Sequence, residues 1–286
     1  MKRLNEFVLE KLKVSKVQKT IYHPNSKEEL IDLIIKEIET NGPNCSLNHI
    51  DVSNINDMGF LFGAGKYNGH PILSKFNGDI SEWDVSNVIH MRGMFANSNY
   101  NGDISNWDVS NVTNMSLMFS KCKYTGKYGD ISDWDVSKVS NMSYMFNQSK
   151  FNGDISGWDV SNVTNMEGMF ANNGNYNGDI SNWDVSGVKD MGSMFTNSNY
   201  NGDISNWNVS NVINMTAMFY NSNFDGDLSN WNVSKVESFT QMFKNSSFNG
   251  DLSKWKINQK ARKYVTGMYE MFKGSPLENN PPHWYN

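Results

Sequence analysis

Apolar and polar positions repeat along this chain with a period in the twenties. One copy reads FNGDISEWDVSNVIHMRGMF, in which apolar residues recur at fixed offsets between turn-forming Gly, Asp, Ser and Asn. A repeat of this length is typical of a solenoid, whose coils bury their apolar sides only against each other. The tryptophans that mark successive copies are Trp83, Trp107, Trp134, Trp158, Trp183, Trp207, Trp231 and Trp255.

Within one copy, the spacing of apolar residues predicts two elements. Ile80, Trp83 and Val85 fit the inward positions of a short strand, and such strands would pair side by side in a parallel sheet. The steps of three and four through Met91, Met94 and Phe95 predict a short helix. Residues typical of helix N-caps precede its first apolar position in most copies: Asp57, Asn114, Asn141, Asn165, Asp190, Asn214 and Ser238. We therefore expect an α/β solenoid of about nine coils, each of about 24 residues, with a parallel sheet on one face.

The two ends differ from the repeats. Apolar spacing predicts a short amphipathic helix over residues 3–14 and a stronger helix over 27–40, which a capping box at Ser26 opens. We interpret residues 1–48 as a helical leader and cap, 49–273 as the repeat solenoid and 274–286 as a tail. Trp284 falls outside the period, and we expect it to pack over the last coil.

Composition and motifs exclude several functions. The net charge is −5 and no basic stripe is visible, which argues against nucleic-acid binding. No apolar run is long enough for membrane insertion, and no export signal is present. Cys45 and Cys122 have neither disulfide nor metal spacing. Because no catalytic constellation appears either, we do not expect an enzyme.

The repeat unit GDISNWDVSNVTNMSLMF resembles the BspA-like surface proteins, which are related to leucine-rich repeats and to the mycoplasma lipoprotein-associated repeat. The likeness covers residues 50–273 and implies a leucine-rich-repeat-like solenoid at the cell surface that binds host or partner proteins. The missing export signal instead favours a cytoplasmic or virion-associated location. The leader KRLNEFVLEKLKVSK also resembles N-terminal segments of tailed-phage proteins.

One outward column gives the main candidate binding surface. Its charge changes from acidic to neutral and then to Lys256 along the axis, so a partner there would present a basic surface. The alternative is a column that is merely solvated. The column consists of Asp84, Asp108, Asp135, Asp159, Asp184, Asn208 and Asn232. Length changes between copies fall in one loop, which adds Tyr124, Lys127 and Asn173 as variable-loop candidates.

Other repeated residues have structural interpretations. The Gly-Asp step, as at Asp79, predicts carboxylates that accept backbone N–H bonds in turns, and we do not expect calcium there. We expect the Trp column to be buried rather than to stack on glycans, and the Met column to fill the core. The predicted function is non-catalytic protein recognition or adhesion without a cofactor. A structural or cargo component of a phage particle, tethered by the N-terminal helix, is the alternative.

Overall fold

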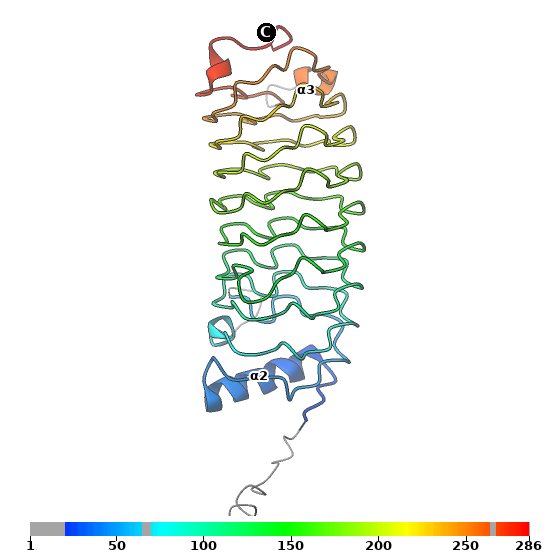
Figure 1. Ribbon diagram of the computed structural model, residues 1–286, viewed down its shortest axis with the longest axis vertical. Coiled ribbons are helices and arrows are strands. Elements are labelled where there is room, and N and C mark those ends of the chain that lie inside the picture. Colours follow the sequence, from blue (N-terminus) through cyan, green and yellow to red (C-terminus); the bar gives the residue numbers. More distant parts are fainter. Residues whose placement is uncertain (1–20, 65–69, 264–266, 286) are drawn as a thin grey trace, which may run out of the picture.

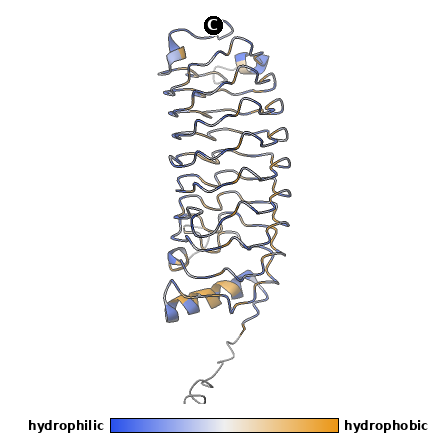
Figure 2. Ribbon diagram, in the orientation of Figure 1, coloured by the Kyte–Doolittle hydropathy of each residue, from blue (hydrophilic) through white to orange (hydrophobic). Residues whose placement is uncertain are grey.

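The computed structural model describes residues 21–64, 70–263 and 267–285, which form an elongated stack of coils (Figure 1). The described regular elements are α2 (Lys27–Asn41), η1 (Leu73–Lys75), α3 (Gln259–Lys263) and η2 (Pro276–Glu278). The helix predicted for 3–14 lies outside the described residues. Figure 2 shows hydrophobic and hydrophilic positions alternating along each coil, as the repeat pattern requires.

The helix predicted for residues 27–40 is confirmed by α2. The Ser26 side chain accepts a hydrogen bond from the Glu29 N–H, and Gly42 ends the helix with a φ of 85°. Leu30, Ile34 and Ile38 are buried on one side of α2 and join the same hydrophobic core as the coils. The helix therefore closes the N-terminal end of the stack (Figure 1).

The predicted α/β solenoid with a leucine-rich-repeat-like parallel sheet is wrong. The described residues contain no strand, and neighbouring coils are joined by isolated parallel bridges, such as Asn114 to Asn141. The segment expected to be a strand is a pair of turns instead. The Trp83 N–H bonds the Ile80 carbonyl, and the Val88 N–H bonds the Val85 carbonyl. Inward spacing alone did not distinguish these turns from an extended strand.

The helix predicted in each coil is also wrong. The segment from Met91 to Asn97, which we call a Met turn, and its equivalents contain no described helix. Two residues of each Met turn have positive φ, at positions such as Leu117 (61°) and Lys121 (55°), which breaks both helix and strand. The predicted N-cap residues instead form the isolated parallel bridges between successive coils. Their side chains close a local turn, as the Asn114 Oδ1 does by accepting the Ser116 N–H at 2.9 Å.

Alternate backbone N–H groups of the Met turns bond toward the C-terminal end of the stack. The N–H groups of Met91, Gly93 and Phe95 bond carbonyls of the next coil, while alternate N–H groups close turns within their own coil. The same pattern repeats from coil to coil. Each coil therefore satisfies its backbone only when a further coil, or a substitute for one, follows it.

The expected burial of the tryptophans is confirmed. Each periodic indole is 3–4% exposed. Its Nε1–H donates to a carbonyl of the preceding coil, as Trp107 does to Ile80 at 3.1 Å and Trp158 to Ile131 at 2.9 Å. Phenylalanines form a second buried column, in which the rings of Phe95 and Phe119 stack with centroids 5.7 Å apart. These contacts fix the register of neighbouring coils.

The C-terminal tail imitates a further coil. Trp284 donates its Nε1–H to the Leu252 carbonyl at 2.7 Å and stacks on Trp255 with ring centroids 6.1 Å apart. The Glu278 carboxylate accepts the Gly274 N–H, which would otherwise seek a carbonyl of the next coil. The expectation that Trp284 packs over the last coil is confirmed.

Replacing an internal indole tests the register contact. We expect Trp158→Phe to lower the free energy of unfolding by about 1–3 kcal/mol, because the Ile131 carbonyl keeps only the Trp134 N–H of its two donors and the smaller ring leaves space in the core. The measurement is urea unfolding followed by far-ultraviolet circular dichroism. An exposed-site control, Lys150→Gln, leaves the midpoint unchanged. An unchanged midpoint for Trp158→Phe would show that the indole bond does not contribute.

Two buried tyrosines allow a test of whether a hydrogen bond from the hydroxyl contributes to stability. The Tyr124 hydroxyl donates to the Gly129 carbonyl, whereas the Tyr176 hydroxyl is buried without a hydrogen-bond partner, and Phe151 fills the equivalent position between them. We expect Tyr124→Phe to destabilise the protein by about 1 kcal/mol and Tyr176→Phe to be neutral or stabilising. Equal losses in urea midpoint for both variants would contradict this assignment.

Candidate functional site

The predicted acidic column is exposed along one side of the stack, but its side chains also shape turns. The Asp135 Oδ1 accepts the Ser137 N–H at 3.0 Å. Asn208 accepts the equivalent Ser210 N–H at 3.2 Å, so Asp and Asn serve the same turn. The same bond occurs at Asp84, Asp108, Asp159, Asp184 and Asn232. The repetition of these residues therefore has a structural explanation.

Electrostatics support that structural role. Hydrogen bonds from the following serine hold the pKa of Asp108, Asp135 and Asp184 below its ordinary value. The negative charge of Asp135 opposes this effect at Asp108, while Lys138 favours the charged form of both carboxylates. The carboxylates of Asp108 and Asp135 therefore repel each other across neighbouring coils, while the serine hydrogen bonds favour their charged forms.

The Gly-Asp column follows the turn interpretation given by the sequence. The Asp79 Oδ1 accepts hydrogen bonds from both the N–H and the hydroxyl of Ser81, and the N–H bond recurs at Asp154. Among the described residues, no group of three His, Cys, Asp or Glu side chains could hold a metal ion.

Two of the three variable-loop candidates are part of the core. Tyr124 is buried and stacks on Phe119 with ring centroids 4.4 Å apart. Asn173 is buried, and its side chain donates to the Phe151 carbonyl and accepts the Tyr176 N–H. Lys127 is exposed and lies over the Tyr128 ring at 5.3 Å. Only Lys127 is therefore available to a partner.

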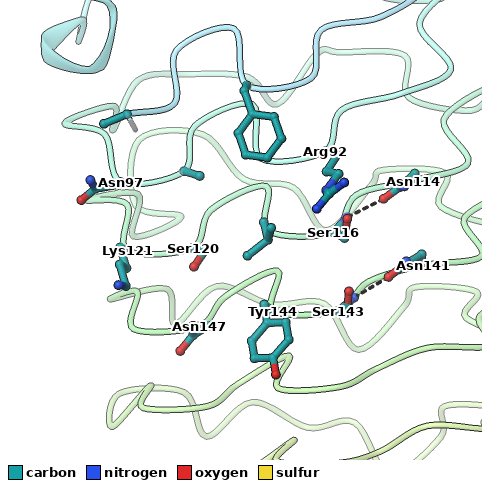
Figure 3. A pocket seen from close by; sticks show the side chains of 14 residues that line it. Arg92, Asn97, Asn114, Ser116, Ser120, Lys121, Asn141, Ser143, Tyr144 and Asn147 are labelled. Carbon is teal, nitrogen blue, oxygen red and sulfur yellow. Dashed lines mark hydrogen bonds between the residues drawn. The ribbon is translucent and has the colours of Figure 1, made fainter. Parts of the chain in front are cut away.

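A concave site lies instead on the face formed by the Met turns. This bay has a volume of about 760 Å³ and crosses four coils (Figure 3). Among its lining residues, Phe60 comes from the first of these coils, Leu117 from the third and Tyr144 from the last. The lining residues are Phe60, Ala64, Arg92, Ala96, Asn97, Asn114, Ser116, Leu117, Ser120, Lys121, Asn141, Ser143, Tyr144 and Asn147.

Two aromatic rings define the ends of the bay because glycines follow them in the next coil. A Cβ on Gly93 would come within 2.3 Å of the Phe60 ring, and a Cβ on Gly168 would come equally close to the Tyr144 ring. Each ring also meets a charged neighbour of that glycine. The Arg92 guanidinium lies 5.6 Å from the Phe60 centroid, and the Tyr144 hydroxyl donates to the Glu167 carboxylate at 2.6 Å.

The bay carries positive charge in an acidic protein. Arg92 and Lys121 line it and are exposed, and no Asp or Glu is among its lining residues. Sequence reasoning missed this site because it treated the Met segments as core helices. The signal was present in the copies: the two positions between paired methionines vary from Arg-Gly to Ser-Leu, Ser-Tyr and Glu-Gly, while the methionines stay.

These features define a tandem-repeat protein in which a constant buried frame carries variable exposed positions. The family model described as "Mycoplasma protein of unknown function, DUF285" matches residues 36–127, 123–223 and 196–284. The chain therefore belongs to this family, which supports the resemblance to a mycoplasma repeat family, though not the BspA-like name. No curated protein matches the chain, and no solved structure does. Among the described residues, no helix has the length and apolar character needed to cross a bilayer.

The acidic column predicts a pH-dependent stability. Because its pKa values are lower in the folded chain, these carboxylates stabilise it fully above their ordinary pKa of 3.8, and that stabilisation is lost as the pH falls below this value. We expect the triple variant Asp108→Asn, Asp135→Asn, Asp184→Asn to be less stable than the wild type at pH 7, because it keeps the turn bonds without the charge, and to lose less stability between pH 5 and 3. Urea midpoints at the two ends of this range provide the measurement.

The matched control replaces the same three aspartates with alanine, which removes the turn bond at every pH. We expect this variant to be less stable than the asparagine variant at both pH values, because alanine cannot accept the serine N–H. An asparagine variant with the acid sensitivity of the wild type would show that these carboxylates do not contribute to it.

Proposed function

We propose that this protein is a non-catalytic recognition scaffold and that the Met-turn face, with its bay, binds a partner molecule. One observation carries the proposal: copies differ at solvent-accessible positions of this face, whereas the methionine and phenylalanine positions beside them are buried and repeat. Tandem copies of the family model are compatible with such a scaffold. The finer assignment to BspA-like adhesion is part of the proposal.

The structure of the Met turns supports this separation between buried, repeated positions and variable, accessible ones. The paired methionines and the following phenylalanine are buried, with Met115, Met118 and Phe119 at 0% exposure. Between them the chain presents Leu117, and in the next coil Tyr144, without changing the backbone path, because both residues adopt the same positive φ. Side chains at this position can therefore change with little effect on the frame, which is how repeat proteins acquire binding surfaces.

A basic protein surface is the second candidate partner, through the acidic column. None of its five aspartates forms an ion pair within the described part of the chain. A cationic partner would relieve the repulsion between neighbours such as Asp108 and Asp135. The phage-particle alternative stays a prediction, because no observation in the described coils favours it.

Glycine, which other coils already carry at the equivalent position, can replace the two bay rings and so test the bay. The double variant Phe60→Gly, Tyr144→Gly removes both rings, and glycine suits the backbone there, since Gly93 and Gly168 occupy the same position in other coils. We expect this variant to lose partner binding by about tenfold or more, because the rings form the ends of the site. The measurement compares purified full-length proteins on arrays of immobilised proteins and saccharides, followed by surface plasmon resonance on each hit.

Two further variants separate the surfaces. Gln241→Gly places glycine at the equivalent positive-φ position of a coil outside the bay, and this variant should keep wild-type binding. The variant Asp108→Asn, Asp135→Asn, Asp159→Asn keeps the turn bonds, and it should weaken only partners with a basic surface. A bay variant that binds every hit as tightly as the wild type would overturn the assignment of binding to this face.

A further inference from the structure

The bay contains two cations that no other described residue neutralises. Arg92 is exposed, and its side chain lies over the Phe60 ring, which orients the guanidinium and leaves its N–H edges free. Lys121 lies on the opposite side of the bay (Figure 3) and has no ion pair among the described residues. An arginine held in place in this way is suited to a planar anion, which it binds through two parallel hydrogen bonds.

The polar groups around these cations favour hydrogen-bond donation. The Oδ1 atoms of Asn114 and Asn141 already accept the N–H groups of Ser116 and Ser143, as Figure 3 shows. Each side-chain amide therefore turns its NH₂ group to other partners. With the guanidinium and the ammonium, the bay offers donors in excess, and it complements a ligand that is rich in acceptor oxygens.

The apolar part of the site limits the shape of that ligand. Phe60, Leu117 and Tyr144 are partly exposed, and together they present ring edges and a methyl surface along the floor and ends of the bay. A volume of about 760 Å³ is within the range of small-molecule sites and suits one or two sugar rings. A sugar offers both hydroxyl oxygens and apolar C–H faces, which match these two parts of the lining.

The backbone argues against two other anions. The N–H groups of Met91, Gly93 and Phe95 are all bonded to the next coil, so the Met-turn backbone cannot cradle a phosphate as helix N-termini and backbone nests do. The same pairing leaves this backbone no N–H groups with which to add an acidic peptide as a strand. Recognition must therefore use side chains, and the arginine fork without backbone N–H groups beside it suits the two oxygens of a carboxylate.

We infer that the bay binds a saccharide that carries a carboxylate, with Arg92 on the acid group, Lys121 on sugar oxygens at the opposite side of the bay, and Phe60, Leu117 and Tyr144 against the ring. This inference rests on the proposed recognition function and specifies its ligand class. The acid could belong to a free uronic acid or to the end of a glycan chain, because both present the same chemistry.

The direct test compares glucuronate with glucose on the full chain by saturation-transfer NMR and calorimetry. We expect glucuronate to bind and glucose to bind about tenfold more weakly or not at all, because glucose lacks the charge-assisted bonds. Arg92→Gln should weaken glucuronate binding by about tenfold, and Lys121→Gln by several-fold. Arg262→Gln, which removes an exposed arginine outside the bay, should leave it unchanged. A glucuronate-terminated oligosaccharide distinguishes a chain end from the free sugar.

Several results would overturn the ligand class. These are equal affinity for glucuronate and glucose, tighter binding of inorganic phosphate or of tetraglutamate, or equal effects of Arg92→Gln and Arg262→Gln. The scaffold proposal fails separately, when removing both bay rings changes no partner binding. If neither sugar binds while the ring-deleted variant still loses its partner, the scaffold stands and only the saccharide assignment is wrong.

Discussion

The structure depends on a register contact that each coil makes with its neighbours. An indole N–H reaches back to a carbonyl of the preceding coil, and the Met-turn N–H groups reach forward to carbonyls of the next. Both sets of bonds are buried or internal to the stack, so a shift by even one residue would leave polar groups without partners. The core residues can therefore be nearly identical from coil to coil and still specify one alignment.

This one-directional pairing creates a problem at the ends, and the chain solves it without another repeat. At the N-terminal end, α2 lies over the core with Leu30, Ile34 and Ile38 inward. At the C-terminal end, Trp284 supplies an indole as a next coil would, and the Glu278 carboxylate takes the place of a backbone carbonyl of that coil. Capping is therefore chemical as well as steric, which repeat proteins require if their end coils are to stay soluble.

The frame also explains where function can reside. Positive φ at two places in each Met turn directs one variable side chain per coil onto an exposed face without disturbing the buried methionines. Large rings at this position require glycine in the following coil, as Phe60 does above Gly93. The bay arises between two such pairs. The acidic column, by contrast, repeats because its side chains hold turns, and its charge is a consequence that a basic partner could use.

Much of the organisation could be predicted from local patterns. The sequence by itself determined the period, the burial of the indoles, the helix over Lys27–Asn41 and the turn role of the Gly-Asp step, because each depends on spacing or on contacts within a few residues. It could not reveal the turns around Ile80 and Trp83, since inward spacing is the same for a strand and for two tight turns. Only the tertiary structure decided that the Met segments are not helices, because their N–H groups bond the next coil, about 24 residues away. It also brought Phe60, Arg92, Lys121 and Tyr144 together, since stacking turns residues on successive coils into spatial neighbours.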